Sequence, residues 1–162
     1  MKLFRQLLSI LMLPFMVVVV IPSWLLSSGR SAGETLIATR GWVVLAGAIL
    51  LATGLATFTW CVALFGRIGR GTLAPWDPTH HLVVAGPYRY VRNPMILSVV
   101  LILLGEAVFF RSAALWAWLA VFVLINHVYF VVLEEPGLER RFGRSYVDYK
   151  QRVPRWVPHK PR

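Results

Sequence analysis

The chain has 162 residues and a formal net charge of +10, with 57% hydrophobic and only 15% charged residues. Its mean hydropathy is +0.65, and soluble domains carry about 25% charged residues. This composition excludes an ordinary soluble domain and indicates that the lipid bilayer is the solvent. The basic residues lie mainly beside apolar runs, which favours contact with lipid phosphates over nucleic-acid binding. The single cysteine, Cys61, excludes an intramolecular disulfide and a cysteine-based zinc site.

The first apolar run, residues 7–26, contains no charged residue. About 20 helical residues cross a hydrocarbon core of roughly 30 Å, so we expect the first transmembrane helix here. Pro14 and Pro22 are expected to kink it, which neighbouring helices can accommodate. A signal peptide is the alternative, because Lys2 and Arg5 precede the run. The run is longer than a typical signal-peptide core, and no A-x-A cleavage site follows it.

A second uncharged run, residues 41–65, predicts another transmembrane helix after a polar loop. Residues 66–93 then form a connection rich in glycine and proline, which prevents any long helix or strand. A connection of this length in a compact protein is usually functional or disordered. Its apolar and aromatic residues argue against disorder. We therefore expect this connection to be an ordered functional element.

Two further apolar runs, residues 94–110 and 112–133, are separated by Arg111 alone. So short a turn predicts a tight antiparallel hairpin, which either spans the membrane fully or re-enters it. Glu106 is a candidate functional residue because carboxylates inside a membrane are costly. Its structural alternative is pairing with Arg111 at the outer interface. Asn126 and His127 in the last run are interpreted as polar groups between packed helices.

The tail, residues 134–162, is polar but periodic. Its apolar residues recur at spacings of four, four, three and four, and they are Leu138, Phe142, Tyr146, Tyr149 and Val153. This spacing predicts one amphipathic helix that lies at the membrane surface or caps the bundle.

The distribution of basic residues predicts the orientation in the membrane. With four spans and a cytoplasmic N-terminus, all but three of the 17 Lys and Arg residues lie in the cytoplasm, the exceptions being Arg30, Arg40 and Arg111. Residues 1–162 thus form a single all-α membrane domain with both termini inside. The connection of residues 66–93 and the tail then meet at the same membrane face.

Two polar motifs lie at this face. The first runs from His80 to Pro94 and reads HHLVVAGPYRYVRNP; the second begins at Glu134 and reads EEPGL, followed by FGRSY. Together they place arginines, carboxylates, histidines and tyrosines beside an apolar bundle, which suits a polar cofactor meeting a lipophilic substrate. Interfacial anchoring explains these residue types but not their spacing. Asp77, His80 and His81 lack a further strong ligand at suitable spacing, so we expect no metal site.

The ordered pattern H-x-L-V-x-x-G-x-Y-x-x-x-R-[HN]-P, followed by E-E-x-x-L-x-x-x-F-G-x-x-Y-x-x-Y-x-x-x-V-P, covers roughly residues 66–158. It resembles the isoprenylcysteine carboxyl methyltransferase family and its phospholipid methyltransferase relatives. The resemblance implies a membrane enzyme that uses S-adenosylmethionine and methylates a carboxylate or amine of a lipophilic substrate. It also implies that the protein is located in the cytoplasmic membrane of a bacterium or archaeon. The glycines at 66, 69 and 71 do not match the Rossmann pattern G-x-G-x-x-G, which agrees with a cofactor site of another kind.

The resemblance also implies the site residues. Those that line the cofactor pocket would be His80, Leu82, Val83, Gly86, Tyr88, Arg92, Pro94, Glu134 and Glu135. For a carboxylate acceptor, Arg92 or Arg89 would supply the positive charge. For an amine acceptor, Glu134, Glu135 or a neutral histidine would take the proton.

Two departures from the family pattern leave the substrate open: Asn93 stands where many members have histidine, and Ile96 where many have tyrosine. Two other classes of function are kept as alternatives. One is a small transporter subunit with Glu106 as its coupling group, and the other is a membrane scaffold without catalysis. The oligomeric state is not predicted.

Overall fold

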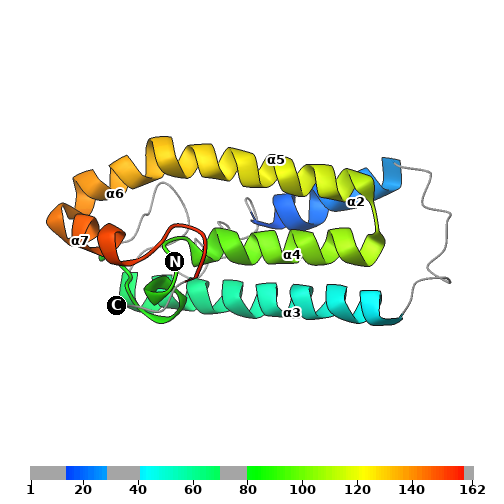
Figure 1. Ribbon diagram of the computed structural model, residues 1–162, viewed down its shortest axis with the longest axis horizontal. Coiled ribbons are helices and arrows are strands. Elements are labelled where there is room, and N and C mark those ends of the chain that lie inside the picture. Colours follow the sequence, from blue (N-terminus) through cyan, green and yellow to red (C-terminus); the bar gives the residue numbers. More distant parts are fainter. Residues whose placement is uncertain (1–13, 29–40, 70–79, 159–162) are drawn as a thin grey trace.

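The computed structural model describes residues 14–28, 41–69 and 80–158. Within these ranges the chain is helical and contains no strand, as the long apolar runs predict. The helices lie side by side along the long axis of the molecule, and the C-terminal elements gather at one end (Figure 1). At that end the connection between the second and third long helices meets the tail.

The first helix is confirmed from Pro14 onward, and residues 7–13 of the predicted span lie outside the described residues. It consists of a π-helical turn, η1 (Met16–Val20), followed by α2 (Ile21–Ser28). The indole Nε1 of Trp118 donates a hydrogen bond to the carbonyl oxygen of Val17 at 3.1 Å. This bond attaches the N-terminal helix to the fourth long helix, α5 (Ala113–Tyr129).

The second predicted helix is confirmed as α3 (Gly41–Leu64), which continues into a π turn, η3 (Phe65–Gly69). It packs along α4 (Pro94–Phe110) through glycines. A Cβ atom on Gly54 would lie 2.6 Å from Cγ1 of Ile102, and one on Gly105 would lie 2.9 Å from the carbonyl oxygen of Gly47. Small residues therefore bring the two backbones into direct contact, as in many membrane helix pairs.

The predicted hairpin is confirmed at its turn. The third helix, α4, ends at Phe110, Arg111 adopts a left-handed conformation with φ of 50°, and α5 begins at Ala113. Asn93 caps the start of α4, since its side chain accepts a hydrogen bond from the amide of Ile96. Pro94 occupies the first turn, where its missing amide hydrogen costs no helical bond.

The fourth helix does not end at residue 133. It continues from α5 through a π turn, η5 (Phe130–Glu134), into α6 (Glu135–Phe142). Pro136 does not stop the helix because it lies in the first turn of α6, directly after the π turn. The EEPGL part of the second motif therefore lies within a helical stretch that extends 30 residues from Ala113 to Phe142.

The prediction of one amphipathic helix in the tail is wrong. Gly143, with φ of +54°, separates α6 from α7 (Arg144–Arg152). Glycine adopts this backbone conformation without steric penalty, so the chain changes direction here. The predicted apolar face nevertheless forms, and the members of its cluster are Tyr146, Tyr149 and Val153, with Leu82, Leu138 and Phe142 packed against them.

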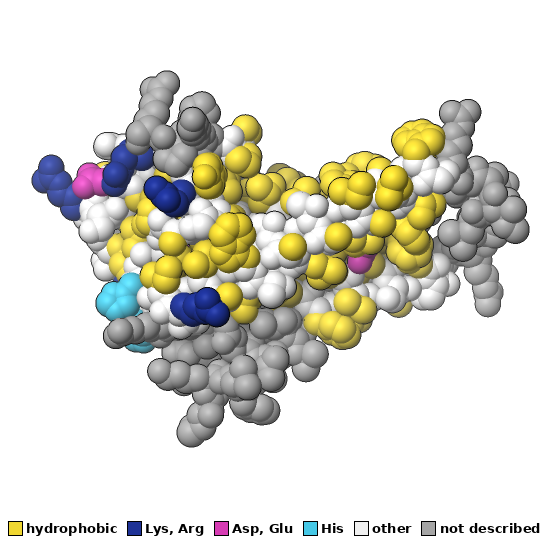
Figure 2. All heavy atoms as spheres, turned by 90° about the horizontal axis from the view of Figure 1, so that it is seen from below, with side chains coloured by type: hydrophobic (Ala, Val, Ile, Leu, Met, Phe, Trp, Pro, Cys, Tyr) yellow, Lys and Arg dark blue, Asp and Glu magenta, His cyan; other side chains and the backbone are white. Residues whose placement is uncertain are grey.

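Two helical stretches are long and apolar enough to cross a membrane, Gly41–Gly69 and Ala113–Phe142, whereas Met16–Ser28 and Pro94–Phe110 are apolar but shorter. Large apolar side chains on the outer faces of α3 and α5 are more than half exposed, among them Trp42, Leu45, Ile49, Leu124 and Ile125. Figure 2 shows hydrophobic side chains along the molecule, with Lys and Arg gathered toward one end. Soluble monomers rarely expose so much apolar surface, so these faces are suited to lipid.

Candidate functional site

The connection before α4 folds back onto the end of α3. The backbone amide of His80 donates to the carbonyl oxygen of Gly69 at 2.8 Å. Gly86, with φ of +57°, begins a short 3₁₀ helix, η4 (Gly86–Arg89). The positive φ favours glycine here, and an added Cβ would lie 2.9 Å from Cδ1 of the Leu64 side chain.

Tyr88 anchors this connection in the interior. Its ring packs with Cys61 and Val83, and its carbonyl oxygen accepts a hydrogen bond from the Tyr149 hydroxyl at 2.7 Å. The Tyr88 hydroxyl, beside the Cys61 thiol, makes no hydrogen bond of ordinary geometry within the described part of the chain. Burial raises the pKa of Tyr88 well above its usual value, so the hydroxyl keeps its proton.

A buried ion network joins the two motifs. Arg92 Nη1 lies 2.7 Å from Oε1 of Glu135, although the residues are 43 positions apart. Arg155 binds the same carboxylate, with Nε 2.8 Å from Oε1 and Nη2 3.1 Å from Oε2. The side chains of Arg92 and Glu135 are 9% and 6% exposed. A carboxylate this buried needs such partners, because an uncompensated charge would be strongly destabilising.

Polar groups with unused hydrogen-bonding capacity surround this network. Glu134 is half-buried and makes no hydrogen bond or ion pair with the described residues. The hydroxyl of Tyr146 and the Nε of Arg92 are buried near one another, and neither has a hydrogen-bond partner in the described ranges. Burial, assisted by the charge of Glu135, raises the pKa of Tyr146 to about 12, so its hydroxyl remains a donor.

The structure therefore brings together part of the predicted site. Arg92, Glu134 and Glu135 lie in one polar cluster next to Tyr146. Pro94 is buried at the start of α4.

The other predicted residues lie around this cluster or outside it. Leu82 packs against the C-terminal tyrosines, and Val83 packs beside Tyr88. His80, His81 and Arg89 are exposed, and no described contact links Arg89 to the ion network.

Sequence reasoning did not select the segment that follows α7. The carbonyl oxygen of Pro154 accepts a hydrogen bond from the backbone amide of Arg92 at 2.9 Å. The indole Nε1 of Trp156 donates to Nδ1 of His127 at 3.0 Å, and its ring also packs near Phe130. The only available signal was the Val-Pro pair that ends the second motif, directly before Arg155.

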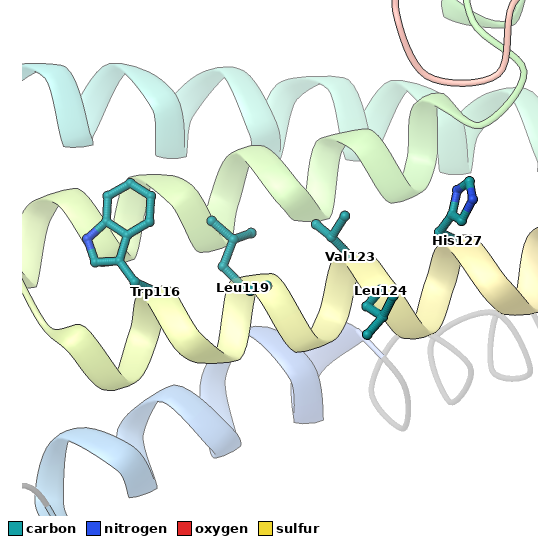
Figure 3. Close-up of a pocket in the computed structure, with 6 residues that line it drawn as sticks. Trp116, Leu119, Val123, Leu124 and His127 are labelled. Atoms are coloured by element: carbon teal, nitrogen blue, oxygen red, sulfur yellow. The ribbon is translucent and has the colours of Figure 1, made fainter.

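A shallow apolar groove runs along α5. Its lining residues are Trp116, Leu119, Ala120, Val123, Leu124 and His127. Figure 3 shows Trp116, Leu119, Val123 and His127 extending from α5 on the side that faces α4. None of the predicted site residues lines this groove.

The model of the phospholipid methyltransferase family matches residues 42–145, which extend from the first turn of α3 into α7 and include the first motif and the beginning of the second, from Glu134 to Ser145. The chain belongs to the phospholipid methyltransferase family. This membership agrees with the expectation drawn from the two motifs, and with the apolar surface it identifies a membrane protein of a methyltransferase family.

Two relatives share 36% identity with parts of this family member. An uncharacterized protein of Haemophilus influenzae aligns over 63 residues, which are 39% of this chain and 100% of that protein. Methanethiol S-methyltransferase 2 of Bradyrhizobium diazoefficiens aligns over 74 residues, 44% of this chain and 26% of that enzyme. The match thus spans about a quarter of the second relative's length. No solved structure gives a significant match.

Proposed function

We propose that this family member uses S-adenosylmethionine to methylate a lipophilic substrate at the polar end of its helix bundle. The observation that carries the proposal is the buried Arg92–Glu135 pair, which joins the two halves of the family motif next to an apolar surface. The proposed acceptor is a carboxylate or an amine. Because one relative is named a methanethiol S-methyltransferase, thiols belong among the acceptors to be tested.

The unused polar groups suit this cofactor, which carries a positive sulfonium, an amino group, a carboxylate and ribose hydroxyls. Arg92 Nε and the Tyr146 hydroxyl offer hydrogen-bond donors. The Glu134 carboxylate, without a partner among the described residues, suits a positively charged group. In this proposal the pocket wall consists of His80, Leu82, Val83, Gly86, Tyr88, Pro94 and Glu135. When bound, the cofactor supplies a methyl group whose bond to sulfur breaks as the acceptor bond forms.

The protein contributes to methyl transfer by aligning the cofactor with the acceptor, by supplying charged groups and by excluding water. Glu134 accepts the proton of an amine acceptor, since, unlike Glu135, it is paired with no arginine of the described chain. A carboxylate acceptor is held instead by Arg92, whose Nη1 already binds Glu135, or by the exposed Arg89. An apolar chain of the substrate remains on the lipid side of the bundle.

The first test is calorimetric titration of the detergent-purified protein with S-adenosylmethionine and S-adenosylhomocysteine. We expect saturable binding that weakens about 10- to 100-fold in Glu134→Gln, the loss typical of one hydrogen bond to a charged group. Glu139→Gln is the matched control, because Glu139 pairs with Lys150 on the exposed surface of α6 and α7. A folded protein that binds neither compound would overturn the proposal and favour the scaffold.

We also propose four spans, with both termini and the cofactor site in the cytoplasm. The support is the charge asymmetry of the sequence and the exposed Arg111 at the opposite end of the α4–α5 hairpin. In intact cells, an impermeant thiol reagent should label Arg111→Cys. The unmodified chain is the control, since its single cysteine, Cys61, is buried. Labelling only after lysis would contradict an external turn.

A further inference from the structure

Four residues after α7, Val153–Trp156, cross the polar end of the bundle, and we name them the C-terminal strap. Val153 is buried with the tyrosines of α7, and Pro154 binds the backbone of Arg92. Trp156 reaches His127 on α5. The strap therefore connects the family's first motif, the second motif and α5 within one short segment.

Resting on the proposed function, we propose that Arg155 is a positioning residue that orients Glu135, and through it Arg92, in the cofactor site. The geometry of the carboxylate supports this role. Oε1 of Glu135 is shared by Arg92 and Arg155, whereas Oε2 is bound by Arg155 alone among the described residues. Contact with one oxygen leaves a carboxylate free to rotate, and contact with both oxygens fixes its plane.

The charges in the network distinguish positioning of Glu135 by Arg155 from stabilisation of the fold. Removing Arg155 leaves Glu135 still paired with Arg92, so no buried charge becomes uncompensated. Arg155 is also the more exposed arginine, with 29% of its side chain accessible against 9% for Arg92. Its loss therefore perturbs the direction of Arg92 more than it weakens the fold.

The test compares three variants of the full chain in detergent. We expect Arg155→Gln to lower the rate of methyl transfer at saturating cofactor by about 10- to 100-fold, as a displacement of about 1 Å in a reacting site does. Arg155→Lys keeps the charge but loses the two-point contact, so only part of the rate should return. Arg152→Gln is the matched control, because exposed Arg152 binds only the carbonyl oxygen of Asp148 in the described chain and should keep its rate within about twofold.

The deciding measurement is a double-mutant cycle with Glu135→Gln. If Arg155 acts through Glu135, adding Arg155→Gln to Glu135→Gln causes no further loss of rate, cofactor affinity or melting temperature. Equal rates for Arg155→Gln and Arg152→Gln, or additive losses in the cycle, would overturn the inference. If the unmodified protein binds no cofactor, the proposed function fails by itself. The melting temperatures then still decide whether Arg155 and Glu135 are coupled, because additive variants shift by the sum of the single effects.

Discussion

Glu135→Ala is expected to lower the free energy of unfolding by about 3–5 kcal/mol, the cost of breaking a buried ion pair by removing one partner. Glu135 is 5% exposed, and its carboxylate is bound by both Arg92 and Arg155. Its removal leaves two guanidinium groups close together, one of them almost fully buried. Unfolding in mixed detergent micelles, followed by helical circular dichroism, measures the change.

The control for this prediction is Glu139→Ala on the neighbouring turn of α6. Glu139 also pairs with a basic residue, Lys150, but both side chains are more than one third exposed in the pair. Exposed ion pairs contribute about 0–1 kcal/mol, so this variant should unfold close to the unmodified protein. Equal stabilities for Glu135→Ala and Glu139→Ala would show that the buried network contributes little.

Gly54→Ala is expected to destabilise the α3–α4 pair by about 1–3 kcal/mol, the usual cost of an extra methyl group in a filled interior. The added Cβ would lie 2.6 Å from Cγ1 of Ile102, 2.8 Å from the carbonyl oxygen of Ser98 and 3.0 Å from the amide nitrogen of Ile102. Because two of these three atoms are backbone, the helices must separate. The melting temperature in detergent should therefore fall.

Gly137→Ala makes the same chemical change where it meets nothing within 4 Å. It lies in α6, and alanine is favoured over glycine in helices by up to about 1 kcal/mol. We expect this variant to match or exceed the stability of the unmodified chain. If both alanine variants melt alike, close glycine packing between α3 and α4 is not what holds them together.

The first and last residues of the helices could be predicted where neighbouring residues in the sequence mark them. The uncharged run of residues 41–65 and the Asn93-Pro94 pair mark the bounds that α3 and α4 show in the structure. The break at Gly143 was missed because the apolar period continues across it. Arg140, Arg141 and the glycine after Phe142 are typical helix-stop signals, so the sequence contained the information.

The candidate site was only partly predictable. Charge asymmetry and loop lengths predicted that the two motifs meet, and the contact between Arg92 and Glu135 confirms that they do. That Glu135 pairs with Arg92 while Glu134 has no partner in the described chain depends on which side of one helix faces the connection. Neighbouring residues on a helix point about 100° apart, and no local pattern distinguishes two consecutive glutamates.

By itself, the sequence determined that this protein is suited to a lipid environment, that it is helical and that it carries its family's motif. Composition, apolar run length and residue spacing can all be read from the sequence without its tertiary structure. Only the tertiary structure decided the partners of the charged groups. The contacts of Arg155 with Glu135 and of Tyr149 with Tyr88 join residues 20 and 61 positions apart. They form because α6, α7 and the C-terminal strap fold back over the connection, and the free energy of that packing belongs to the assembled bundle.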